Sequence, residues 1–243
     1  MITRSDVDEA AKRLAGWVRP TPVLAADPGS LPGPAWFKLE YLQHTGSFKA
    51  RGALNRLLTA RESGELDPRV GIAVASGGNA GIANAYAAAA VGVPATVFVP
   101  ETAPAVKLAR LRALGATVVQ RGTEYAVASL ACTEFAERTG AVLSHAYDQP
   151  AVVAGAGTMA LELADQLDAP IDTIVVAVGG GGLAAGLALA GYRLRAHVAP
   201  RLLEKLKVSR PEAFRGDGWL LAGDGAVRMA AEVEIEGGSS TEE

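Results

Sequence analysis

The sequence predicts an α/β fold with open parallel sheets flanked by helices, and two observations lead to this prediction. Short apolar runs alternate with longer runs rich in Ala and Leu between residues 70 and 190. Glycine-rich turns join several of these runs. Strands that alternate with helices in this way are typical of βαβ units and a parallel sheet. The chain has 243 residues, 49% of them hydrophobic, which is enough for roughly one or two domains with a sizeable core.

The elements are expected in a regular order along the chain. An amphipathic helix starts near Ser5 and is ended by Pro20 and Pro22. A short strand at residues 36–40 and a helix at 47–62 follow. The alternation then predicts strands at residues 70–75, 95–99, 117–120, 141–143 and 171–178, and helices at 79–91, 103–114, 125–139, 151–167 and 183–190.

Composition excludes several classes of protein and site. The net charge of −3, with both signs mixed along the chain, argues against a nucleic-acid partner. Cys132 is the sole cysteine, so an internal disulfide or a cysteine-cluster metal site is impossible, and no metal is expected. The N-terminus is charged without a following apolar stretch, so we expect no signal peptide. The uncharged stretches 71–100 and 173–192 are expected to be strand, glycine turn and helix rather than membrane spans. We therefore expect a cytoplasmic protein.

Lys49 is the first candidate for chemistry. It lies in Ser-Phe-Lys-Ala-Arg-Gly at the start of a predicted helix, beside Phe48 and not on an evidently solvated face. Burial disfavours the charged form of a lysine, and a neutral lysine amine can attack a carbonyl carbon. Taken alone, the pattern fits an ordinary lysine at a helix N-terminus better, since such side chains commonly reach solvent.

Two glycine turns are the other candidates. The first, residues 76–81, reads Ser-Gly-Gly-Asn-Ala-Gly between a strand and a helix, where Asn79 could serve either as a helix cap or as a ligand group. The second is the run of four glycines at 179–182, also between a strand and a helix, which favours a phosphate cradle over a flexible linker. A lysine together with two anion-compatible turns fits pyridoxal phosphate (PLP), a phosphorylated aldehyde that lysine binds covalently.

The ordered motifs resemble those of the threonine/serine dehydratases. The resemblance rests on Leu-Glu-Tyr-Leu-Gln-His-Thr-Gly-Ser-Phe-Lys-Ala-Arg-Gly-Ala at residues 39–53, the turn at 76–81, Pro-Glu-Thr-Ala-Pro at 100–104, Gly-Ala-Gly-Thr at 155–158 and the glycine run. It covers about residues 19–190. These proteins are two-lobed fold type II PLP enzymes, similar to serine racemase and the tryptophan synthase β chain.

The resemblance implies a role for each matching residue. Lys49 would carry the internal aldimine and then remove the α-proton, Phe48 would pack near the cofactor, and Asn79 would bind its phenolic oxygen. The substrate carboxylate would be held by Ser76, Gly77, Gly78 and Asn79, and the phosphate by Gly179, Gly180, Gly181, Gly182 and Leu183. The implied activity is the dehydration of L-threonine or L-serine, through an aminoacrylate, to a 2-oxo acid and ammonia. A homodimer is also implied.

Two departures from the family pattern limit these expectations. Gly77 stands where many relatives have a second serine, which in the racemases is the acid/base on the opposite face, so racemisation is not expected. The family's late motifs, including the residue that binds the pyridine nitrogen, are not recognisable in residues 191–243. We expect that segment to contain a helical piece at 200–208, an alternating run at 227–236 and a polar tail.

The expected lobes follow from these matches. Residues 41–142 would form the small lobe, residues 1–40 with 143–243 an incomplete, truncated large lobe, and the cofactor would lie in the cleft between them. Three alternatives stay open: a PLP-binding but catalytically impaired homologue, another fold type II elimination or replacement enzyme, and an α/β module without PLP.

Overall fold

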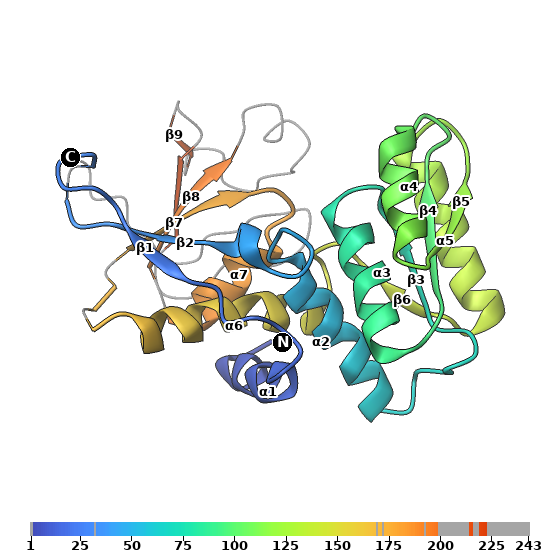
Figure 1. The fold of residues 1–243 in the computed structure, drawn as a ribbon, viewed down its shortest axis with the longest axis horizontal. Coiled ribbons are helices and arrows are strands. Elements are labelled where there is room, and N and C mark those ends of the chain that lie inside the picture. Colours follow the sequence, from blue (N-terminus) through green and yellow to red (C-terminus); the bar gives the residue numbers. More distant parts are fainter. Residues whose placement is uncertain are drawn as a thin grey trace. The chain divides into compact units, whose positions relative to one another are not determined.

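The computed structural model describes residues 2–31, 33–168, 170–171 and 173–191, and the backbone of residues 193–198, 214–215 and 219–222. The chain divides into two compact units. One comprises Arg13–Ala146, and the other comprises Met1–Lys12 with Tyr147–Glu243. Figure 1 labels the elements of both. The lobe boundaries inferred from the sequence stay a prediction.

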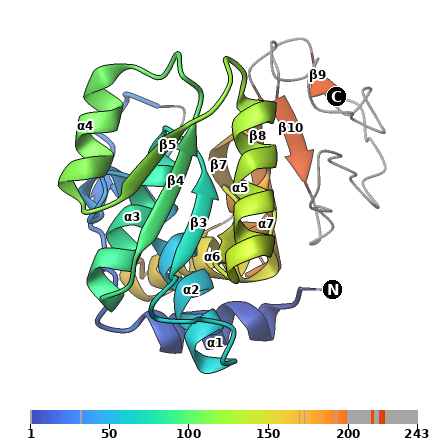
Figure 2. The same ribbon diagram turned by 90° about the vertical axis from the view of Figure 1, so that its right-hand side faces the viewer.

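A four-stranded parallel sheet forms the centre of Arg13–Ala146. Its order is β5-β4-β3-β6, with β3 (Ile72–Ala75), β4 (Ala95–Val99), β5 (Thr117–Gln120) and β6 (Val142–Ser144). The helices of this unit are α2 (Lys49–Glu62), α3 (Asn79–Val91), α4 (Ala105–Ala113) and α5 (Tyr125–Thr139). Figure 2 shows α5 and α3 on opposite faces of the sheet. Strands covered on both faces are mostly apolar, and every residue of β3 and β4 is buried.

Alternate residues of β3 divide the core of this unit into two clusters. Ile72 and Val74 pack with the leucines of α2 and with Ile82 of α3. Ala73 and Ala75 instead pack with Phe98 of β4 and with Ala128, Cys132 and Ala136 of α5. This alternation follows from the two-residue period of a strand. The small residues on the second side let α5 approach the sheet closely.

The other unit is built around a second sheet, whose order is β7-β8-β10-β9. β7 (Thr173–Val178) and β8 (Arg193–Val198) are parallel, whereas β10 (Trp219–Ala222) is antiparallel to β8 and to β9 (Phe214–Arg215). The helices α6 (Pro150–Gln166) and α7 (Gly182–Leu189) cross at two glycines. A Cβ atom on Gly157 would lie 2.7 Å from the carbonyl oxygen of Gly186. Only glycine at this crossing allows the two backbones to approach so closely.

Four elements precede α2 in the chain. α1 (Arg4–Leu14) opens the chain, and Arg4 donates a hydrogen bond of 2.9 Å to the carbonyl oxygen of Ala190, just after α7. β1 (Val23–Ala25) and β2 (Trp36–Lys38) form a two-stranded antiparallel sheet. A 3-10 turn, η1 (Glu40–Leu42), follows β2 and leads into the segment before α2.

The α/β class, with parallel strands flanked by helices, is confirmed. Most of the predicted elements occur within two residues of their expected bounds. The sequence prediction missed β1. It also placed no parallel strand after residue 191, whereas β8 pairs in parallel with β7. The helical piece expected at 200–208 and the run at 227–236 lie outside the described residues.

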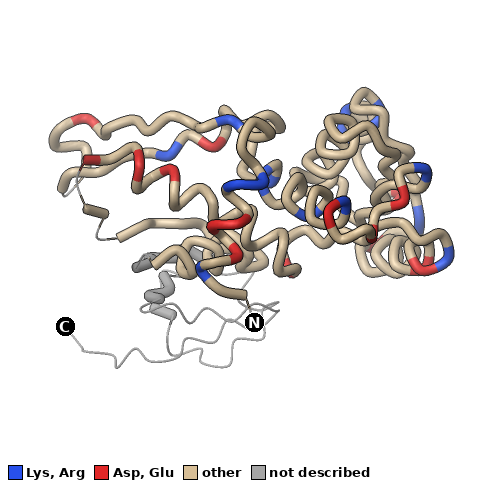
Figure 3. The backbone as a smooth tube through the Cα atoms, turned by 90° about the horizontal axis from the view of Figure 1, so that it is seen from below, with Lys and Arg blue, Asp and Glu red and all other residues tan. Residues whose placement is uncertain are grey.

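The surface of the described residues carries both signs of charge. Figure 3 shows basic and acidic residues interspersed along each unit, in keeping with the mixed charge of the sequence. None of the described helices has the length and apolar character needed to cross a bilayer.

Candidate active site

Lys49 begins α2, and its amine is held inside the unit Arg13–Ala146. The Lys49 Nζ donates a hydrogen bond of 2.6 Å to the carbonyl oxygen of Ala146, just past β6. The same nitrogen lies 4.9 Å from the centre of the Phe48 ring. Burial lowers the pKa of Lys49 from 10.5 to about 8, because the buried amine loses the water that stabilises its charged form. The sequence also allowed an ordinary lysine whose side chain reaches solvent at a helix N-terminus, and the structure does not show that arrangement.

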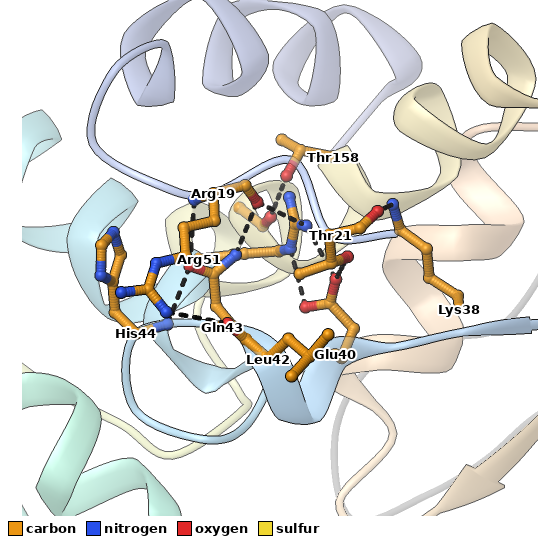
Figure 4. A network of polar contacts seen from close by, with 10 residues as sticks. Arg19, Thr21, Lys38, Glu40, Leu42, Gln43, His44, Arg51 and Thr158 are labelled. Atoms are coloured by element: carbon orange, nitrogen blue, oxygen red, sulfur yellow. Dashed lines mark hydrogen bonds and ion pairs between the residues drawn. The ribbon is translucent and has the colours of Figure 1, made fainter. Parts of the chain in front are cut away.

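A buried ion pair fixes the backbone on both sides of Lys49. The side chain of Arg51 is fully buried, and its Nε and Nη2 donate to the two carboxylate oxygens of Glu40 at 2.9 and 2.8 Å. Thr21 donates its hydroxyl to the same carboxylate, and Lys38 Nζ donates to the Thr21 carbonyl oxygen at 2.7 Å. Figure 4 shows this network. A bidentate arginine–carboxylate pair has a defined orientation, so it anchors η1 to the first turn of α2.

A glutamine holds the neighbouring loop in the same network. Gln43 donates its Nε2 to the carbonyl oxygen of Arg19 at 2.8 Å, and its Oε1 accepts from the backbone N–H groups of Arg19 and His44, each at 3.1 Å. The Gln43 side chain is buried. The segment between η1 and Lys49 is thus tied at both ends, which limits where the lysine backbone can lie.

The turn between β3 and α3 is compact and offers backbone donors. The Gly78 N–H donates to the Ser76 Oγ at 3.2 Å. A Cβ atom on Gly81 would lie 1.8 Å from the Ser76 carbonyl oxygen, so the turn closes on the helix only with glycine there. The first hydrogen bond within α3 runs from Ile82 N–H to Gly78 O. The N–H groups of residues 79–81 precede it and are available to an anion.

The glycine run lies in the other unit, between β7 and α7, against the ring of Tyr147. A Cβ atom on Gly180 would lie 2.4 Å from three ring carbons of Tyr147, and one on Gly182 would lie 2.6 Å from the Tyr147 carbonyl oxygen. Gly181 has φ = +85°, a left-handed backbone conformation that residues other than glycine rarely adopt. The run is therefore required by close approach, and it is not a flexible linker.

The same run precedes a helix that has no side-chain cap. The first intrahelical hydrogen bond of α7 runs from Ala185 N–H to Gly181 O at 2.9 Å. The backbone N–H groups of Gly182, Leu183 and Ala184 precede that bond, as at any helix start. A helix N-terminus with a positive dipole end and such donors suits a phosphate group.

The predicted site residues fall into two sets. Phe48, Lys49, Ser76, Gly77, Gly78 and Asn79 belong to Arg13–Ala146, while Gly179, Gly180, Gly181, Gly182 and Leu183 belong to the other unit. Sequence reasoning missed Glu40, Arg51 and Tyr147. A signal for Arg51 was present, because it is a charged residue between small and apolar neighbours at the start of a helix.

Comparison with known proteins identifies the family of the chain. Residues 14–204 match the family described as pyridoxal-phosphate dependent enzymes. The chain belongs to this family. It is 35% identical to the L-threonine ammonia-lyase of Thermotoga maritima over 97% of the chain and 60% of the relative. It is 40% identical to the L-threonine ammonia-lyase of Geobacter sulfurreducens over 82% of the chain and 49% of the relative.

Solved structures support the same family assignment. The serine racemase of Dictyostelium discoideum superposes with a TM-score of 0.74 at 36% identity, covering 82% of this chain and 66% of that one. The chain spans about half to three fifths of the length of the curated relatives that it matches.

The residues present fit PLP. An aldehyde cofactor needs a lysine amine that is partly neutral, and Lys49 has a lowered pKa. A cofactor phosphate needs a cradle of backbone N–H groups without side chains, and the run at 179–182 admits no Cβ at positions 180 and 182.

Proposed function

We propose that this chain is a PLP-dependent ammonia-lyase that converts L-threonine or L-serine to a 2-oxo acid and ammonia. The observation that carries the proposal is the desolvated Lys49 amine at the start of α2, whose pKa is lowered to about 8. The identity of 35–40% to proteins named L-threonine ammonia-lyase supports the choice of substrate class. The similarity to a serine racemase supports L-serine as a second substrate.

PLP, when bound to an amino acid, would stabilise the negative charge that develops on the Cα atom. The role proposed for Lys49 is to hold the cofactor and, once released, to take the proton from Cα. With a pKa of about 8, about a quarter of the amine is neutral at pH 7.5, against about 0.1% for an ordinary lysine. The Ala146 carbonyl oxygen accepts from the amine and so restricts its orientation.

The turn at residues 76–79 is proposed to bind the substrate carboxylate. The Ser76 hydroxyl and the N–H groups at the start of α3 are donors on one short turn, which matches the two oxygens of a carboxylate. Gly77 and Gly78 let the carboxylate approach the backbone. Asn79 is proposed to bind the phenolic oxygen of the cofactor, and Phe48 to pack beside it.

The phosphate group is proposed to bind at residues 179–182 and at the Leu183 N–H. The Tyr147 ring packs against this run at Gly180, and the first-turn N–H groups of α7 follow the run directly. A homodimer and a cytoplasmic location remain predictions from the sequence.

A second candidate function is PLP binding without turnover. The chain spans 49–60% of its curated relatives, so part of what they contain has no counterpart here. The family's residue that binds the pyridine nitrogen is not recognisable in residues 191–243, and without such a partner the cofactor would withdraw electrons less strongly.

One assay separates the two functions. The purified, PLP-loaded chain is incubated with L-threonine and with L-serine, and 2-oxobutanoate, pyruvate and ammonia are measured. We expect turnover by the wild type and by Lys107→Ala, a control at an exposed lysine on α4, and none by Lys49→Ala. Bound PLP without any 2-oxo acid from either substrate would contradict the ammonia-lyase and favour the second function.

A further inference from the structure

A small cavity lies beside Lys49 and has no role in the function proposed above. Its volume is about 50 Å³, and it is lined by Ala75, Tyr125, Ser129, Cys132, Thr133, Leu143, Ser144, His145 and Ala146. All of these residues belong to the unit Arg13–Ala146. The cavity lies between α5 and the carboxyl ends of β3 and β6, the side of a parallel sheet where ligands bind.

Two lining residues connect the cavity to the candidate active site. Ala146 accepts the hydrogen bond of the Lys49 amine at 2.6 Å. Ala75 is followed directly by Ser76, the first residue of the turn proposed to bind the substrate carboxylate. An amino acid whose carboxylate lies on that turn and whose Cα proton faces Lys49 therefore has this cavity within reach of its side chain.

The chemistry of the lining fits a short, neutral, polar side chain. Tyr125, Ser129 and Thr133 recur at intervals of four on α5, so they share one face of the helix. The Thr133 hydroxyl donates to the Ser129 carbonyl oxygen at 3.2 Å. The Ser129 hydroxyl has no hydrogen-bond partner among the described residues. Cys132 and Leu143 supply an apolar wall, and the lining contains no Lys, Arg, Asp or Glu.

The volume limits what the cavity can accept. A water-sized group needs about 10–15 Å³ by this measure, so the cavity holds about four such groups. The side chain of serine has two non-hydrogen atoms and that of threonine has three, and both fit. An aromatic ring does not.

We propose that this cavity receives the side chain of the substrate amino acid, and that Ser129 forms a hydrogen bond with its β-hydroxyl group. The inference rests on the proposed function and assigns a site to the short β-hydroxylated side chain of its substrate. Ser129 is then a specificity-determining residue, and Thr133 positions it by holding the adjacent turn of α5.

The test uses three variants of the PLP-loaded chain. Ser129→Leu fills the cavity, and Ser129→Ala removes the hydroxyl without filling it. Leu130→Ser is the control, because Leu130 is 60% exposed and does not line the cavity. Binding is followed through the visible spectrum with L-alanine and L-2-aminobutyrate, which match serine and threonine in carbon skeleton but lack the hydroxyl. This readout needs no turnover.

We expect Ser129→Leu to retain PLP and to lose affinity for L-2-aminobutyrate by about tenfold or more, because the longer side chain needs the space that leucine takes. The loss for L-alanine should stay below about threefold. Ser129→Ala should raise KM for L-serine and L-threonine about three- to tenfold while leaving the Kd values for both analogues unchanged. Leu130→Ser should change none of these values.

Two results would overturn the inference. The first leaves the proposed function intact, and the second removes it as well. If PLP-loaded Ser129→Leu loses the same affinity for L-alanine as for L-2-aminobutyrate, or loses none, the substrate side chain lies elsewhere. The proposed function then stands. A wild-type chain that binds no PLP removes the proposed function and this inference together.

Discussion

Lys49 shows how local burial lowers the pKa of a lysine amine. The amine donates a hydrogen bond to the Ala146 carbonyl oxygen but loses most of its contact with water. The charged form loses more hydration energy than the neutral form, which lowers the pKa. The cost of this arrangement falls on the folded protein, because the unfolded chain binds the proton more tightly.

That cost predicts a pH dependence of stability in the cofactor-free protein. The lowering from 10.5 to about 8 corresponds to about 3 kcal/mol of destabilisation, fully present below pH 8 and relieved as pH rises toward 10.5. Lys49→Met should therefore be more stable than the wild type at pH 7.5, and the difference should shrink by pH 10. Urea unfolding of both proteins at the two pH values measures it. A difference that does not change with pH would contradict the buried amine.

Arg51 is the second residue with a large expected effect. Its side chain is fully buried and its guanidinium is bound by Glu40, so removing it leaves an unpaired buried carboxylate. We expect Arg51→Ala to lower the free energy of unfolding by about 3–5 kcal/mol. Arg69→Ala, at an exposed pair with Asp67, should lower it far less, because water screens that pair. Urea unfolding measures both variants. Equal losses of unfolding free energy would show that the buried ion pair contributes no more to stability than the exposed one.

At the scale of elements, close approach explains the glycines better than flexibility does. Gly180 packs on the Tyr147 ring, and Gly157 packs on Gly186 where α6 crosses α7. In both places a single methyl group would overlap a neighbour, so the loop and the helix pair depend on the absence of a side chain. The position of α7, and with it the proposed phosphate site, follows from these contacts.

The glycine run offers a matched pair of substitutions. A Cβ atom on Gly180 would meet the Tyr147 ring at 2.4 Å, whereas one on Gly179 has nothing within 4 Å. Gly180→Ala should weaken PLP binding by about tenfold or more, since the loop must move, and Gly179→Ala should change it less than about threefold. Fluorescence titration with PLP measures both. Adding Tyr147→Ala to Gly180→Ala should restore part of the affinity for PLP. If Gly180→Ala and Gly179→Ala bind PLP equally well, and Tyr147→Ala restores nothing, the phosphate binds elsewhere.

At the scale of the whole molecule, the sequence was sufficient to predict the elements and motifs that have a regular pattern. The βαβ alternation predicted the sheet of β3 to β6, and the motifs around Lys49, Ser76 and the glycine run predicted the candidate site residues. β1 was missed because three residues after two prolines carry no periodic signal. β8 was missed because it is not an apolar run, although Arg-Leu-Arg-Ala-His-Val at 193–198 alternates as a strand does.

Contacts between residues that are distant in the chain could not be predicted from the sequence, for a different reason. Glu40 and Arg51, or Tyr147 and Gly180, meet only after the chain has folded, and no spacing rule links them. The cavity beneath α5 is of the same kind, because it is lined by residues from a helix and the ends of two strands. Such features require the three-dimensional arrangement.

The central claim, that Lys49 holds the cofactor, is tested most directly by covalent labelling. The purified chain is incubated with PLP and reduced with borohydride, which fixes the cofactor to the amine that holds it, and the labelled peptide is found by mass spectrometry. We predict a label on Lys49 in the wild type and in Lys107→Ala, and none in Lys49→Ala. A label on another lysine, or on none in the wild type, would contradict the account.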